Sequence, residues 1–165
     1  MQYRKLPNDI NNIIGKQSSI AGVNDSNQLI PSIQERGVWT PKFIGYGGGE
    51  AQVSMSYGRY LKIGNLVTVS IDITWADVGN LEGYVCIGTF PFQADNSDGN
   101  GWNSVPISYR NKILNAKDSI IFLTPMGNGS AFHIRQTEGA SFSNLSAANF
   151  QNGSSIAGTF SYICK

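Results

Sequence analysis

Residues 65–75 read NLVTVSIDITW, and apolar and polar side chains alternate from Val67 to Trp75. The apolar set is Val67, Val69, Ile71, Ile73 and Trp75, and the polar set is Thr68, Ser70, Asp72 and Thr74. Successive side chains of a strand point to opposite faces of its sheet, so a period of two predicts a half-buried strand. We expect Trp75, and Trp39 in an earlier strand-like run, to pack in the core.

Shorter runs of the same kind occupy the rest of the chain from Gly37 onward. They read GVWTPKFIG, QVSMSYGRYLKIG, GYVCIGTF, VPISYRN, SIIFLTP, AFHIRQ and SIAGTFSYIC, and each is bounded by Gly, Asn, Asp or Pro. About eight strands at this spacing, without a helical period between them, predict an all-β fold. The expected architecture is an antiparallel β-sandwich, jelly-roll-like, over residues 37–165.

Glycines mark the expected turns. Gly58 and Gly64 bracket the run RYLKI, which predicts a turn at each of its ends, and Gly64–Asn65 suits a tight turn into the long strand. Asn128 and Gly129 predict a two-residue hairpin, because a type I′ turn needs a positive φ at both positions. The runs on either side of Asn128–Gly129 are therefore expected to be neighbouring strands.

Residues 1–36 differ from the rest in composition and predict a connector or stalk. They are rich in Asn, Ser and Gln and hold one aromatic residue, Tyr3. A short helix with Asn8 as its N-cap would carry Ile10, Ile13 and Ile14. Such a short helix is marginal in water, so the three isoleucines need a partner, either the main domain or another copy of the chain.

Length and charge narrow the function classes. The 165 residues suit one domain, and the net charge of +1 provides no global field to attract nucleic acid. No stretch approaches the roughly 20 apolar residues that span a bilayer, and the basic start lacks the apolar run of a secretory signal, so we expect no membrane insertion. Cys86 and Cys164 lie in strand-like runs without metal-ligand spacing, which predicts two buried thiols.

Three stretches resemble the β-rich module near the C-terminus of bacteriophage tail fibres and tailspikes: GVWTP at 37–41, YGRYLKIGNLVTVSIDITW at 57–75 and GTFPF at 88–92. The resemblance implies a homotrimeric tip module that helps the fibre trimerise and contacts polysaccharide on the bacterial surface. It also implies other phage tail components as partners, and a place in the virion tail after assembly in the host cytoplasm. Depolymerase activity in that family usually belongs to a separate upstream β-helix, and this sequence shows no such repeat.

The polar loop QADNSDGNGWNS, residues 93–104, has three open interpretations. Asn96, Asp98 and Asn100 alternate before Gly101 as in the first half of an EF-hand loop, yet Ile107 occupies the position of the bidentate Glu. A shallow calcium site using Asp95 and Asp98, a sugar-contacting loop and a structural or interface loop all stay possible, and we predict no resident metal or cofactor.

In the sugar-binding interpretation, an exposed Trp102 stacks on a pyranose ring while neighbouring side chains take the hydroxyl groups. The candidate polar contacts are Asp95, Asp98, Asn100 and Asn103, with His133 and Arg135 as further outward-facing candidates. We expect a binding module and not an enzyme.

The alternative function is a polysaccharide-cleaving domain, a glycosidase or lyase, with a carboxylate pair. A glycosidase needs two carboxylates about 5 to 10 Å apart, and the close pairs available are Asp95 with Asp98 and Asp72 with Asp77. The sequence contains no G-x-S-x-G nucleophile motif, and His133 is its single histidine. GYGGGE at 45–50 lacks the lysine of a phosphate-binding loop and predicts a flexible strand connection.

Overall fold

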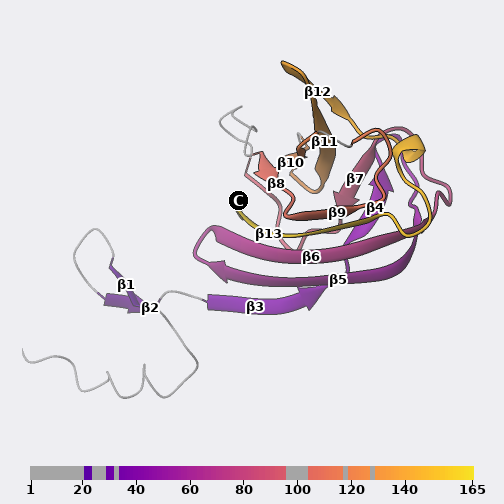
Figure 1. Ribbon diagram of the computed structural model, residues 1–165. Coiled ribbons are helices and arrows are strands. Elements are labelled where there is room, and N and C mark those ends of the chain that lie inside the picture. The colour runs from indigo at the N-terminus through magenta and orange to yellow at the C-terminus, as the bar shows by residue number, and fades with distance from the viewer. Residues whose placement is uncertain (1–20, 24–28, 32–33, 96–103, 117–118, 127–128) are drawn as a thin grey trace, which may run out of the picture.

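The computed structural model describes residues 21–23, 29–31, 34–95, 104–116, 119–126 and 129–165. Two antiparallel sheets account for most of these residues and form a sandwich (Figure 1). A short 3₁₀ turn, η1 (Ala147–Asn149), is the helical element of the described residues. The predicted all-β sandwich is confirmed. None of the described helical structure is long and apolar enough to cross a membrane.

A five-stranded sheet contains the alternating stretch. Its strands, in order across the sheet, are β3 (Gln34–Trp39), β5 (Gln52–Ile63), β6 (Leu66–Asp77), β13 (Ser155–Ile163) and β9 (Tyr109–Asn111). Figure 1 shows β3, β5, β6 and β13 running side by side in one layer. Gly64 and Asn65 join β5 directly to β6, with Gly64 at φ 57°, so the predicted tight turn is confirmed.

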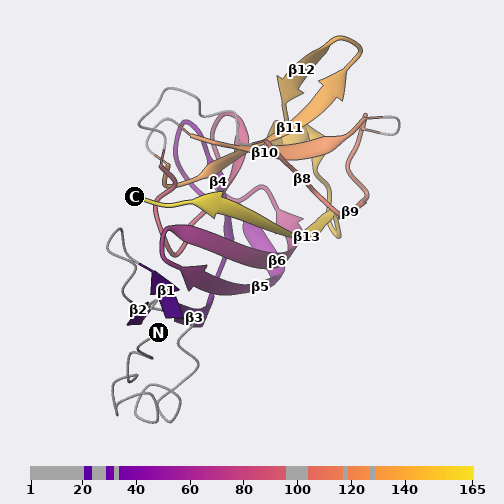
Figure 2. The same ribbon diagram turned by 90° about the vertical axis from the view of Figure 1, so that its left-hand side faces the viewer.

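A six-stranded sheet forms the other layer. The strands in order are β4 (Lys42–Gly45), β7 (Val85–Gly88), β11 (Phe132–Glu138), β10 (Ile121–Pro125) and β8 (Val105–Pro106), and β12 (Ser141–Asn144) pairs with the second half of β11. The hairpin of β11 and β12 projects from the rest of the sheet (Figure 2). β10 and β11 are neighbours, as the Asn128–Gly129 pair predicts, although Asn128 itself lies outside the described residues.

The chain crosses between the sheets inside two runs that the sequence shows as continuous. Thr40 and Pro41 lead from β3 in one sheet to β4 in the other. In VPISYRN, β8 belongs to the six-stranded sheet and β9 to the five-stranded one. A run of alternating residues predicts extended backbone but does not tell which sheet it joins. In the structure each of these two runs contains two strands, one in each sheet.

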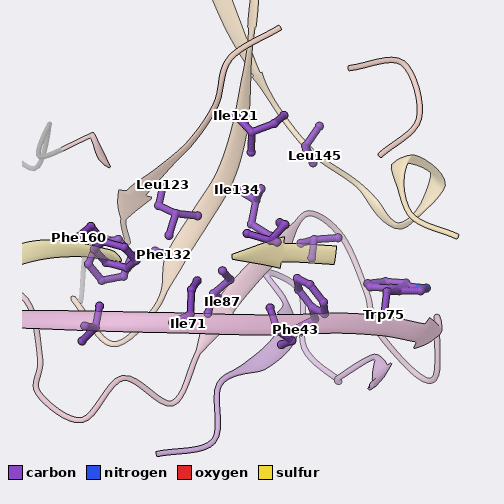
Figure 3. Close-up of a cluster of buried hydrophobic side chains, with 14 of the residues drawn as sticks. Phe43, Ile71, Trp75, Ile87, Ile121, Leu123, Phe132, Ile134, Leu145 and Phe160 are labelled. Carbon is purple, nitrogen blue, oxygen red and sulfur yellow. The ribbon is translucent and has the colours of Figure 1, made fainter. Parts of the chain in front are cut away.

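Side chains from both sheets meet in one core. The alternating apolar set of β6 is buried throughout, and Trp75 stacks on Phe150 with ring centroids 4.9 Å apart. Figure 3 shows Leu123 and Ile134 of the six-stranded sheet pointing toward β6, where Ile71 lies. The half-buried strand is therefore confirmed, and its polar residues face outward.

Gly58 has a different role from the one predicted. β5 continues through Gly58 without a turn, so that prediction is wrong. A Cβ at this position would lie 2.5 Å from Nε1 of Trp39 on the paired strand β3. The missing side chain makes room for the indole ring, which packs on the edge of the core against Phe90, with ring centroids 4.9 Å apart.

The segment predicted to be a connector contains a small antiparallel pair, β1 (Ala21–Val23) and β2 (Leu29–Pro31). Asn8 and the three isoleucines Ile10, Ile13 and Ile14 lie outside the described residues, so the helix and its trimer contact stay predictions. β3 begins at Gln34, inside residues 1–36, and the division of the chain after residue 36 also stays a prediction.

Candidate functional site

The outer face of the six-stranded sheet gathers aromatic and polar side chains. The strand register places His133 opposite Cys86 on β7 and Thr124 on β10. Residues two positions apart in a strand share a face, so the register identifies the other members of this surface. We call it the aromatic face, and it comprises Ile44, Tyr46, Tyr84, Cys86, Phe122, Thr124, His133, Arg135, Phe142 and Asn144.

Three aromatic side chains of this face remain exposed. Tyr46, Tyr84 and Phe142 keep 60, 47 and 46% of their surface accessible to water. The two tyrosines are adjacent, since the backbone N–H of Tyr46 donates to the carbonyl oxygen of Tyr84 at 2.8 Å. Solvent-exposed aromatic rings offer a flat apolar surface to a ligand. Each tyrosine adds a hydroxyl that can both donate and accept hydrogen bonds.

Arg135 lies over the Phe142 ring, and two contacts hold its side chain in place. Its Nε donates to Oδ1 of Asn144 at 2.8 Å, and its guanidinium carbon lies 4.7 Å from the centre of the Phe142 ring. Among the described residues it makes no ion pair, because their one salt bridge joins Lys42 to Glu50. Partial burial lowers the pKa of Arg135 from its usual value, but the group stays charged at neutral pH. The face therefore presents a positioned positive charge.

His133 faces outward, as the alternation predicts, and is half-buried. Its ring lies 5.3 Å from the Tyr46 ring, and its Nδ1 lies 3.4 Å from Sγ of Cys86. Burial and, secondarily, the charge of Arg135 lower the pKa of His133, so the imidazole is neutral at pH 7. Burial raises the pKa of Cys86 to about 12, which keeps its thiol protonated.

The two cysteines have no reactive character. Cys86 and Cys164 are both buried free thiols, as predicted. The Cys86–His133 contact resembles a nucleophile and base in its distance, but a protonated, fully buried thiol does not attack a substrate. Contact with the Cys86 thiol instead helps to pack and orient the His133 ring.

Thr124 completes the row that contains Cys86 and His133. Its side chain is 2% exposed, and within the described part of the chain its hydroxyl oxygen has no hydrogen-bond partner. A buried hydroxyl without a partner costs about 1 to 3 kcal/mol, so this row holds unused hydrogen-bonding capacity beside the imidazole.

The polar loop at 93–104 starts at the end of the sandwich where β11 begins. The Ala94 N–H donates to the carbonyl of Gly129 in the β10–β11 turn at 2.9 Å, and the Asp95 N–H donates to Ile163 at 2.8 Å. The loop ends at β8, which pairs with β10. Of the residues predicted to bind sugar, Asp98, Asn100, Trp102 and Asn103 lie outside the described residues. The structure brings His133 and Arg135 together on β11 and places Asp95 on the loop that starts near that strand.

The residues that make up the aromatic face include no Asp or Glu. The described residues contain no group of three or more His, Cys, Asp or Glu side chains that could hold a metal ion. Asp72 lies on the outer face of the other sheet, and Asp77, five positions along β6, belongs to the opposite set of the alternation. Asp98 lies outside the described residues, so its pairing with Asp95 stays a prediction.

Sequence reasoning missed most of the aromatic face. Tyr46 follows β4 within a glycine-rich connection, Tyr84 precedes β7, and Phe142 lies in β12, a strand that the sequence did not predict. The available signal was the set of aromatic residues next to glycines and in the polar run SFSN, where no core position would be expected. Their convergence depends on pairings between distant strands, which local patterns do not specify.

Comparisons with known proteins support the fold. No known family profile matches the sequence, and no curated protein matches it either. Among solved structures the chain is similar to the crystal structure of the Dettilon tailspike protein (gp208), with a TM-score of 0.63 and 16% sequence identity. The match covers 79% of this chain and 24% of that one, so the chain spans about a quarter of the length of the tailspike. The chain thus has a fold similar to part of a phage tailspike protein.

Proposed function

We propose that the protein is a phage tail fibre or tailspike module that binds carbohydrate on the surface of the host bacterium through its aromatic face. The observation that carries this proposal is the exposure of Tyr46, Tyr84 and Phe142 on the face that also presents Arg135. The likeness to the Dettilon tailspike protein supports a role in a phage tail, and thus a place in the virion.

The chemistry of the face suits sugars. Pyranose rings have apolar C–H faces that pack on aromatic rings, and their hydroxyls need donors and acceptors at the ring edge. Tyr46 and Tyr84, whose backbones are adjacent, supply two rings, and His133 supplies an imidazole beside the Tyr46 ring. Asn144 supplies an amide. His133, Arg135, Phe142 and Asn144 lie on strands and contact one another or neighbouring side chains, which limits the ordering entropy that binding must overcome.

The polar loop extends this site in our proposal. Loops at the end of a sandwich vary while the sheets hold their ends, which is how such scaffolds carry recognition. Asp95 begins the loop with its backbone tied to β13, and Trp102 remains the predicted stacking residue of its tip. The proposed activity is binding without cleavage.

The module is proposed to act as a homotrimer. The outer face of the five-stranded sheet exposes a row of aliphatic side chains that the register places side by side: Ile63, Leu66 and Ile163. Leu66 and Ile163 are each 45% exposed. Contiguous apolar surface of this kind indicates a protein contact, and we propose that it packs between subunits together with the predicted contact of Ile10, Ile13 and Ile14.

The test is binding to an array of bacterial polysaccharides. The variant Tyr46→Ala should weaken binding by roughly 1 to 3 kcal/mol, since it removes a stacking ring without disturbing the core. Tyr109→Ala is the matched control, because Tyr109 is 55% exposed on the opposite outer face, and it should bind normally. Equal binding by both variants and the unaltered protein would exclude the aromatic face, and release of new reducing ends from the polysaccharide would show cleavage instead.

A further inference from the structure

Arg135 is an unusual group for a surface that binds neutral sugars. The guanidinium is partly buried against Phe142, and its Nε is used by Asn144. Within the described residues its terminal Nη atoms have neither a carboxylate partner nor a hydrogen bond to the protein. Water reaches these atoms, because they are not among the buried polar atoms without a partner. An anionic group of a ligand can replace that water, and partial burial of the guanidinium strengthens the resulting interaction.

Among the residues that the structure describes, no acidic side chain pairs with Arg135. Glu138, the nearest carboxylate along β11, accepts hydrogen bonds from Ser143 at 2.6 Å and from Gln136 at 3.2 Å. Glu50 pairs with Lys42 at the far edge of the sheet. Among the described residues the charge of Arg135 is therefore not paired with a carboxylate, and it can interact with an anionic ligand.

We propose that the aromatic face selects acidic polysaccharides, with the guanidinium of Arg135 binding a carboxylate group of the sugar while Tyr46 and Tyr84 contact the sugar rings. This inference rests on the proposed function and adds the chemical class of its ligand. The planar fork of an arginine matches the two oxygens of a carboxylate and forms shorter, stronger hydrogen bonds than a neutral donor does.

The charge of the site matches one carboxylate. His133 adds no positive charge at neutral pH, because burial and Arg135 lower its pKa. Lys42, the cation at the β4 edge, is already paired with Glu50. A single positive charge with a planar donor set suits one carboxylate, such as that of a uronic acid or a pyruvate ketal, because its two coplanar oxygens can accept both hydrogen bonds of the fork. Phosphate diesters and sulfate esters also carry one charge each, so the experiment compares polymers that carry them with carboxylate polymers.

The experiment uses the full chain on an array of bacterial polysaccharides with acidic and neutral repeating units. Each acidic polysaccharide that binds is then tested after chemical reduction of its carboxyl groups to alcohols, which removes the charge and keeps the sugar backbone. We expect binding to acidic members and a loss of at least about tenfold after reduction, which corresponds to one charge-assisted interaction of about 1.4 kcal/mol or more.

Three variants assign the effect to Arg135. Arg135→Gln should lose the preference for the acidic form, and Arg135→Lys should keep part of it because the charge remains without the planar fork. Lys112→Gln removes the same charge from an exposed residue outside the face and should bind as the unaltered protein does. Thermal unfolding of each variant identifies any loss of binding that comes from loss of fold, and the lysine variant preserves the test if Arg135→Gln does not fold.

Two results would overturn the inference, and they differ in meaning. If reduced or neutral polysaccharides bind as well as acidic ones, or only phosphate or sulfate polymers bind, carboxylate selection is wrong while carbohydrate binding stands. If no polysaccharide on the array binds, the proposed function itself fails and this inference fails with it.

Discussion

The two outer faces of the sandwich differ although the same chain builds both. On the five-stranded sheet, hydroxyl pairs cross between β6 and β13, with Thr68 and Ser161 at 2.7 Å and Ser70 and Thr159 at 2.7 Å, and an aliphatic row lies beside them. On the six-stranded sheet, the Phe142 ring contacts Arg135 and the Tyr46 ring contacts His133. Aliphatic side chains gain from burial against another protein, whereas aromatic and polar groups together suit a sugar.

Each outer face has an arginine over an aromatic ring, and the two arginines differ in how far they are buried. Arg59 lies 5.0 Å from the Tyr57 ring and is exposed, while Arg135 lies 4.7 Å from the Phe142 ring and is half-buried. Nε of Arg59 donates to the hydroxyl of Tyr57, whereas Nε of Arg135 donates to an amide oxygen. The contact of an arginine with an aromatic ring is thus exposed on one face and half-buried on the other, where we propose that it binds an anion.

The largest expected effect separates the interior of the six-stranded sheet from its outer face. Phe132 is fully buried and its ring centroid lies 4.4 Å from that of Phe90, so Phe132→Ala should lower the free energy of unfolding by about 3 to 5 kcal/mol. Phe142→Ala, on the exposed strand β12, should cost less than about 1 kcal/mol. Urea unfolding measures both. A comparable cost for Phe142 would mean that the aromatic face stabilises the fold and is not held for a ligand.

The next effect concerns assembly through the five-stranded sheet. Leu66→Glu places a charge in the proposed subunit contact, and desolvation of that charge should prevent trimer formation. Light scattering should then change from three times 17.9 kDa to 17.9 kDa, while each subunit keeps its affinity for a monovalent sugar fragment. A trimer that survives Leu66→Glu would show that the aliphatic row lies outside the contact, and a monomer in the unaltered protein would exclude trimerisation.

The smallest effect is a pH dependence on the aromatic face. The pKa of His133 is lower in the folded protein than its ordinary value of 6.5, so the unfolded chain takes up the proton first as the pH falls. The free energy of unfolding should therefore decrease as the pH falls below about 6.5, and it should be constant above that value for this group. His133→Gln should remove this contribution. An unchanged pH profile in the variant would mean that His133 titrates alike in both states.

The sequence predicted the fold well where one local pattern was strict. From Val67 to Trp75 every second side chain is apolar, and all five of these apolar residues are buried. The prediction failed where a local signal has two possible causes. Gly58 suggested a turn but makes space for Trp39, and whether a glycine serves a turn or a neighbouring ring depends on a strand that is distant in the sequence.

The candidate site was less predictable than the fold. Alternation along AFHIRQ was enough to place His133 and Arg135 outward, because both follow from the burial of Phe132 and Ile134. Tyr46 and Tyr84 join them only through the pairing of β4 with β7 and of β7 with β11. Phe142 belongs to a four-residue strand whose sequence, SFSN, has too little apolar alternation to predict a strand.

The most direct test of carbohydrate binding by the aromatic face is a crystal structure of the protein with the best-bound oligosaccharide from the array. We expect sugar density across Tyr46 and Tyr84, with a carboxylate group at the Nη atoms of Arg135. Density confined to the outer face of the five-stranded sheet, or to the loop at residues 96–103 without contact to Tyr46, Tyr84 or Arg135, would contradict it.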